Sequence, residues 1–265
     1  ALNALTSGAK NTAIGYSSAS ALLQGNRNTS LGYDSMNALA GDDANNAGSD
    51  NIAIGVDAMG SLNAGVHNDA RANSNVAIGN SAFLAGSMAD SGASVSQGNV
   101  CIGHEAAMTT GTNAQTGITA VGFRALKALT SGAGNTAVGY NSGATINTNT
   151  AIGSNAMGGS QGAGAANYNV AIGNSAMGTG TLNGAGSNVA IGMQSQISLT
   201  TGDSNVAIGS WVDSGNLAPL HTNTAGSYCI AIGTGALGTA NENDNDGTVA
   251  IGHLACEVQA GTGGA

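Results

Sequence analysis

The sequence predicts an all-β protein, a parallel β-solenoid or β-roll of about thirteen stacked coils joined by loops rich in Gly, Asn, Ser and Asp. Three observations lead to this fold class. A short phrase, seen most clearly as Asn169-Val170-Ala171-Ile172-Gly173, recurs from one end of the chain to the other. Glycine supplies 44 of the 265 residues, and bulky aromatic residues are scarce. Repeats at short intervals are typical of solenoids, in which each coil packs only on its neighbours.

The final glycine of each copy is taken as position zero of the repeat. The thirteen repeat glycines are Gly15, Gly32, Gly55, Gly79, Gly103, Gly122, Gly139, Gly153, Gly173, Gly192, Gly209, Gly233 and Gly252. Successive glycines are 14 to 24 residues apart, and insertions of varied length inside a constant motif are typical of surface loops. We expect a single β-solenoid domain over residues 1–265, which begins partway through a coil and lacks obvious caps.

The residues before the glycine are typical of a short strand. Position −3 is always Thr, Val or Ile, position −1 is always Ile, Leu or Val, and position −2 is Ala except at Ser30 and Cys101. Alternation places −3 and −1 on one face of the strand and −2 on the other. Since both faces are apolar, we expect the alanine face to be buried as well, against a second sheet of the same coil or another chain.

Two further features of the repeat have structural interpretations. The glycine ends the strand, either through a backbone angle closed to other residues or through close approach of another backbone. Asparagine stands at position −4 in ten copies, and in stacked coils its amides are expected to form a hydrogen-bonded ladder. These residues are Asn11, Asn28, Asn51, Asn75, Asn99, Asn135, Asn149, Asn169, Asn188 and Asn205.

Composition excludes several classes of function. The chain has 5 basic and 14 acidic residues, and the basic ones are scattered, which argues against nucleic acid as a partner. No apolar run has the roughly 20 residues of a membrane-spanning helix, so membrane insertion is not expected. Hydrophobic residues make up 42% of the chain, which argues against disorder.

The phrase Asn-Val-Ala-Ile-Gly with a small residue at +3 resembles the head repeats of trimeric autotransporter adhesins. The segment 129–140, with its Asn-Thr-Ala-Val-Gly-Tyr ending, looks even more like repeats in phage tail-fibre proteins and large bacterial surface proteins. This resemblance covers nearly the whole chain. It implies a parallel β-solenoid in an extracellular fibre, at a cell surface or in a virion appendage, that is often trimeric and serves reach, rigidity and attachment.

Candidate ligand sites are few. Glu242, Asp244 and Asp246 alternate before a glycine like the start of a calcium loop, but the bidentate Glu expected later is missing. Cys101 with His104, and His253 with Cys256, each offer half of a zinc site. The simpler interpretations are a solvated acidic loop and structural residues, so we expect no cofactor, with Ca²⁺ as the alternative.

Three hypotheses of function follow from the repeat. The first is a non-enzymatic structural protein that assembles with itself, as a trimer or head to tail; no catalytic motif argues for an enzyme. The second is a tail-fibre or adhesin segment that binds cell-surface glycans through its loops. A sugar-stacking surface could be made by Tyr16, Tyr33, Phe123, Tyr140 and Trp211, but the first four share position +1, which favours a structural role. The third, ice binding, would need a regular threonine array, which the −3 position lacks.

Overall fold

The computed structural model describes residues 1–39, 48–60, 71–84, 95–108, 115–127, 129, 132–143, 148–159, 166–211, 217–239 and 246–257. Its regular elements are strands of three residues each. They are β1 (Thr12–Ile14), β2 (Thr29–Leu31), β3 (Ile52–Ile54), β4 (Arg71–Asn73), β5 (Val76–Ile78), β6 (Val95–Gln97), β7 (Val100–Ile102), β8 (Thr119–Val121), β9 (Thr136–Val138), β10 (Thr150–Ile152), β11 (Val170–Ile172), β12 (Val189–Ile191), β13 (Val206–Ile208), β14 (Ile230–Ile232) and β15 (Val249–Ile251). Within these ranges there is no helix of the length and apolarity that crossing a membrane requires.

Thirteen of the strands form one parallel sheet in chain order, from β1 through β3, β5 and β7 to β15. Each consists of positions −3, −2 and −1 of one repeat. Neighbouring strands pair in register, so that Val170, Ala171 and Ile172 of β11 face Val189, Ala190 and Ile191 of β12. The prediction of a parallel β-solenoid of about thirteen coils is confirmed.

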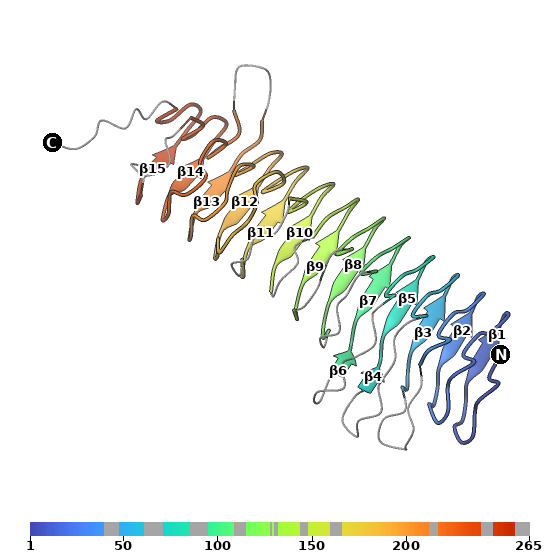
Figure 1. Ribbon diagram of the computed structural model, residues 1–265. Coiled ribbons are helices and arrows are strands. Elements are labelled where there is room, and N and C mark those ends of the chain that lie inside the picture. The colour runs from blue at the N-terminus through green and yellow to red at the C-terminus, as the bar shows by residue number, and fades with distance from the viewer. Residues whose placement is uncertain are drawn as a thin grey trace. The chain divides into compact units, whose positions relative to one another are not determined.

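The chain forms two compact units, residues 1–137 and 138–265, called unit 1 and unit 2. In unit 1 the main strands lie side by side in chain order, and β4 and β6 lie apart from them (Figure 1). β4 pairs with β6 in parallel, and an isolated bridge joins Gln97 to Thr116. The longer coils of unit 1 therefore carry a second short strand.

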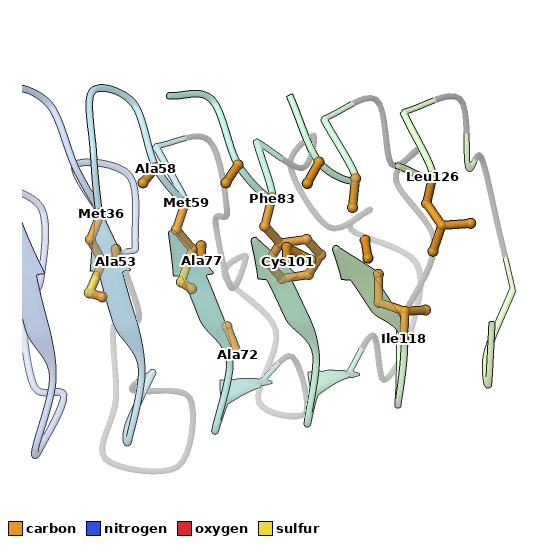
Figure 2. Close-up of a cluster of buried hydrophobic side chains, with 14 of the residues drawn as sticks. Met36, Ala53, Ala58, Met59, Ala72, Ala77, Phe83, Cys101, Ile118 and Leu126 are labelled. Carbon is orange, nitrogen blue, oxygen red and sulfur yellow. The ribbon is translucent and has the colours of Figure 1, made fainter. Parts of the chain in front are cut away.

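The interior of each unit is lined by small side chains. The residues at −2 are buried in both units, apart from the partly buried Ala13 of β1, and they pack with the residues at +3 and +4 of the turn that follows each strand. In Figure 2, Met59 and Phe83 point from the turns toward the strand residues Ala77 and Cys101. The alanine face is therefore buried within its own coil, because the +1 to +4 turn folds back over it.

The bulky residues at −3 and −1 point away from this interior. The expectation that both faces of the strand are buried is wrong for this face, since Ile14 is 60% exposed and Ile152 is 38% exposed. The physical reason is the width of the coil. Between a strand and the turn that folds over it there is room for alanine and for one larger side chain at +4, so the larger side chains of the strand lie outside.

The backbone of the coil uses left-handed residues at fixed positions. The residue at −5 has φ between 55° and 73° in all thirteen copies, and most residues at +2 and +4 have φ near 50°. Non-glycine residues adopt this region at a cost of about 1–2 kcal/mol each. The stacking of coils must compensate for this cost, which means that a coil is stable only with neighbours.

Candidate functional site

Two reasons for the repeat glycines were considered from the sequence, a backbone angle closed to other residues and close approach of another backbone, and the structure contains both. Their φ angles lie between 120° and 148°, a range that residues with a Cβ avoid. A Cβ on Gly173 would also lie 2.5 Å from the carbonyl oxygen of Gly192 in the next coil. At Gly252, by contrast, the nearest atom among the described residues is the Cβ of Ala255, at 4.0 Å. Close approach of the following coil is therefore what separates Gly173 from Gly252.

The asparagines at −4 bind the next coil through both ends of the amide. The Oδ1 of Asn51 accepts the backbone N–H of Asn75 at 3.0 Å, and its Nδ2 donates to the carbonyl of Ala72 at 2.7 Å. The amides also bond to one another, as Asn75 Nδ2 donates to Asn51 Oδ1 at 3.1 Å. Asn169 and Asn188 repeat this arrangement in unit 2. A buried side chain thus satisfies backbone groups that the turn leaves without strand partners.

Three copies lack an asparagine at −4, and two of these still use the preceding one. The backbone N–H of Ile118 donates to Asn99 Oδ1 at 3.0 Å, and that of Cys229 donates to Asn205 Oδ1 at 2.9 Å. Ile118 and Cys229 are buried. The column of asparagines therefore accepts Ile118 and Cys229 as members, and the Cys229 side chain still contacts the backbone of Gly247 and Thr248 in the following coil.

A second set of side chain to backbone bonds lies at position −6 and was not predicted. Asn26 Oδ1 accepts the N–H of Ala9 at 2.8 Å, and Asp203 Oδ1 accepts the N–H of Gly186 at 2.6 Å. The hydroxyls of Ser49 and Ser227, at the same position, likewise accept a backbone N–H of the preceding coil. Because Asn, Asp and Ser all serve here, no single residue type marks the position in the sequence.

The exposed apolar surface of the main sheet is called the outer face, and it consists of the side chains at −3 and −1. Position −1 is Ile, Leu or Val in every copy, and none of these side chains is fully buried. Ile251 is 67% exposed. Monomeric proteins seldom expose a continuous apolar patch of this kind, and such patches mark sites of association.

The aromatic residues proposed to stack on sugars are arranged in pairs. Tyr16 and Tyr33 stack on each other with ring centroids 5.3 Å apart. Phe123 stacks on His104 at 5.2 Å, and the Arg124 guanidinium lies 4.9 Å from its ring centroid. Tyr140 is exposed and Trp211 is half-buried in unit 2. In unit 1 these rings therefore pack against their neighbours in the stack.

A charged cluster adjoins Phe123. Glu105 accepts hydrogen bonds from Lys127 Nζ at 2.7 Å and from Arg124 Nε at 2.6 Å. The ammonium of Lys127 and the guanidinium of Arg124 lower the pKa of Glu105 to about 2. His104 Nδ1 lies 3.9 Å from the same carboxylate. The cluster links two adjacent coils on the surface of unit 1.

The candidate metal ligands are not brought together in the described part of the chain, which contains no group of three His, Cys, Asp or Glu residues suited to a metal ion. Cys101 is buried, and its burial raises the pKa of the thiol. His104, by contrast, stacks on Phe123 at the surface. Glu242 and Asp244 lie outside the described residues. Asp246 Oδ1 accepts the N–H of Ser227 at 2.7 Å.

Two exposed tyrosines of unit 2, Tyr168 and Tyr228, were missed by the sequence interpretation. Both stand at position −5, and both have φ near 60°. The sequence did contain a signal for them, which is that two copies of the repeat carry an aromatic residue at the same position.

Comparison with known proteins adds no assignment. No family model matches the chain, and neither a curated protein nor a solved structure matches it.

Proposed function

We propose that this chain is a non-enzymatic structural subunit of an extracellular fibre or filament, and that it assembles with further copies of itself through the outer face. The observation that carries the proposal is the uninterrupted Ile, Leu and Val column at position −1, which is exposed or half-buried in both units. Covering this column with another protein surface would remove apolar area from water, at about 25 cal/mol per Å².

A second copy of the chain is the partner that fits this face best. The apolar side chains recur once per coil, at a step of about 4.8 Å. A second copy presents the same step, so its side chains can interdigitate with the first over many coils. Isologous or cyclic contacts of this kind are the common form of homo-oligomers. Trimeric association through the outer face and head-to-tail stacking of the terminal coils are distinguished by the experiment below, because only the first depends on the outer face.

The proposed location at a cell surface or in a virion appendage rests on the resemblance to adhesin and tail-fibre repeats. The proposal of a non-enzymatic role is supported by the contacts of the buried polar side chains. In the described residues the asparagines at −4 bond mainly to backbone groups of adjacent coils, which is a structural task.

Assembly is tested by placing charges on the outer face of unit 2. The variant I172K/I191K adds two ammonium groups to the −1 column, and the control T181K/T201K adds them at exposed positions outside the outer face. We expect the wild type and the control to form trimers or filaments in sedimentation velocity and negative-stain electron microscopy. We expect I172K/I191K to sediment as a monomer with an unchanged circular dichroism spectrum.

Two outcomes would contradict the proposed assembly through the outer face. A wild-type chain that sediments as a monomer at every concentration contradicts the proposal, and so does assembly that survives in I172K/I191K.

A further inference from the structure

Two exposed tyrosines and two serines form one column on the surface of unit 2. Tyr168, Ser187, Ser204 and Tyr228 each stand five positions before a repeat glycine. Each of the last three donates its backbone N–H to the preceding coil at 2.9–3.0 Å, which places them in successive coils. Tyr168 and Tyr228 are therefore three coil steps apart, about 14 Å at about 4.8 Å per step.

Both tyrosines occupy this position against the preference of the backbone. Their φ angles are 61° and 60°, in the left-handed region that bulky residues seldom adopt. Glycine stands at the same position in three coils of unit 1, at Gly98, Gly117 and Gly134. The rings gain no burial in exchange, since Tyr168 is 66% and Tyr228 67% exposed. Since every residue at −5 shares this angle, the distinguishing feature of the two tyrosines is an exposed aromatic ring without a packing role, which is free to contact a ligand.

The surface between the two rings is polar and uncharged or acidic. Ser187 and Ser204 are exposed. The exposed Asp203 beside them is held in place because its Oδ1 accepts a hydrogen bond from the N–H of Gly186. Residues 138–265 contain no Lys and no Arg. A ligand with carboxylate, sulfate or phosphate groups would find no cation here, so the chemistry favours a neutral ligand rich in hydroxyl groups.

We propose that this column binds an unbranched neutral polysaccharide that lies along the stack of coils. The apolar faces of two sugar rings pack on Tyr168 and Tyr228, and the hydroxyls between them hydrogen-bond to Ser187, Ser204 and the Asp203 carboxylate. A separation of about 14 Å is one that a short extended oligosaccharide spans. The binding role is additional to the self-assembly proposed above, and it uses side chains at −5, whereas the outer face consists of those at −3 and −1.

Affinity gel electrophoresis of the full chain tests the proposal, with the unbranched neutral polysaccharides barley β-glucan, glucomannan or pullulan in the gel and alginate as the acidic comparison. We expect at least one neutral polysaccharide to retard the wild type, and alginate to have no effect. The variants Y168S and Y228S install the residue found in the same column at Ser187 and Ser204. Each is expected to weaken binding about tenfold, and the double variant to abolish retardation.

The control Y16S/Y33S removes two exposed tyrosines that stack on each other in unit 1, and it should leave retardation unchanged. Circular dichroism and sedimentation of Y168S/Y228S should match the wild type, which separates this site from the assembly face. Three results would overturn the proposal: no retardation by any neutral polysaccharide, retention of binding in Y168S/Y228S, or binding of alginate alone.

Discussion

Units 1 and 2 share a backbone plan and differ in the side chains that this plan leaves free. Both bury a small residue at −2, turn an apolar residue outward at −1 and hold position −5 in the left-handed region. Unit 1 contains all five basic residues and eight acidic ones, and unit 2 contains six acidic residues and no basic one. Threonine fills −3 in four coils of unit 1, and in unit 2 it does so once, at Thr150.

The comparison separates two kinds of constraint. Residues that touch the backbone of the next coil, such as the glycines at zero and the asparagines at −4, are fixed in type by the stacking of the coils. Side chains that reach solvent differ in charge and polarity between the units. The coil is therefore a constant frame whose surface can acquire separate binding properties.

The largest expected effect comes from filling the space between coils. Gly173→Ala and Gly252→Ala strain similar φ angles, 135° and 129°, and among the described residues a backbone oxygen lies 2.5 Å from the new Cβ at Gly173 and none lies within 4 Å of it at Gly252. We expect Gly173→Ala to cost about 4 kcal/mol or more and Gly252→Ala about 1–2 kcal/mol. Urea unfolding followed by circular dichroism measures both; equal costs would show that φ alone selects glycine.

The second effect comes from the asparagine column. Asn169→Ala removes the acceptor of the Asn188 N–H and the donor to the Ala185 carbonyl, both in the buried interior. We expect a loss of about 2–3 kcal/mol, because two buried backbone groups are left without a partner. Asn174→Ala, at an exposed position, is the matched control and should change the free energy of unfolding by less than about 0.5 kcal/mol.

The third effect is a gain. Position +4 is apolar in unit 1 from Met36 to Leu126, whereas unit 2 has Gln196 there, fully buried and with neither Oε1 nor Nε2 in a hydrogen bond. Gln196→Met introduces the residue found at Met157 and Met177 in the same column. We expect stabilisation of about 1–3 kcal/mol, since an unpaired buried amide is removed. A rise in melting temperature reports it, and a fall would mean that the amide has a partner.

The smallest effect is the acid dependence of the charged cluster of unit 1. Lys127 and Arg124 hold the pKa of Glu105 near 2, below its usual 4.5, so the unfolded state takes up the proton first as pH falls. The stabilising contribution of this group is complete above about pH 4.5 and is lost as pH falls toward 2. Glu105→Gln should therefore flatten this part of the melting-temperature profile, and Lys127→Met should do so partly.

The parts of the fold that could be predicted from sequence are those with one residue type at one position. Glycine at zero, asparagine at −4 and alanine at −2 repeat because every coil imposes the same contact on its neighbour. Alternation shows which residues share a face of a strand, and it does not show which face is inside. The turn at +1 to +4 decides which face is inward, because it folds back over the alanine side.

The remaining features had weaker signals for physical reasons. The bonds at −6 use Asn, Asp and Ser interchangeably, since each offers an oxygen to the neighbouring N–H. Glu105 and Arg124 stand at +2 of successive repeats and Lys127 stands at +5, but position +2 holds many residue types, so no single type marks their cluster. Tyr168 and Tyr228 stand out because their rings are exposed, and the sequence does not show which side chains at position −5 reach solvent.

The contact between successive repeat glycines has a consequence for how such a chain can grow. Every coil offers the same bare backbone to the coil after it, so the fit at each junction is independent of which two coils meet. Within either unit, duplicating one coil in the gene would insert a segment already matched to both neighbours. Length can thus change by whole coils through recombination, with no compensating substitutions elsewhere.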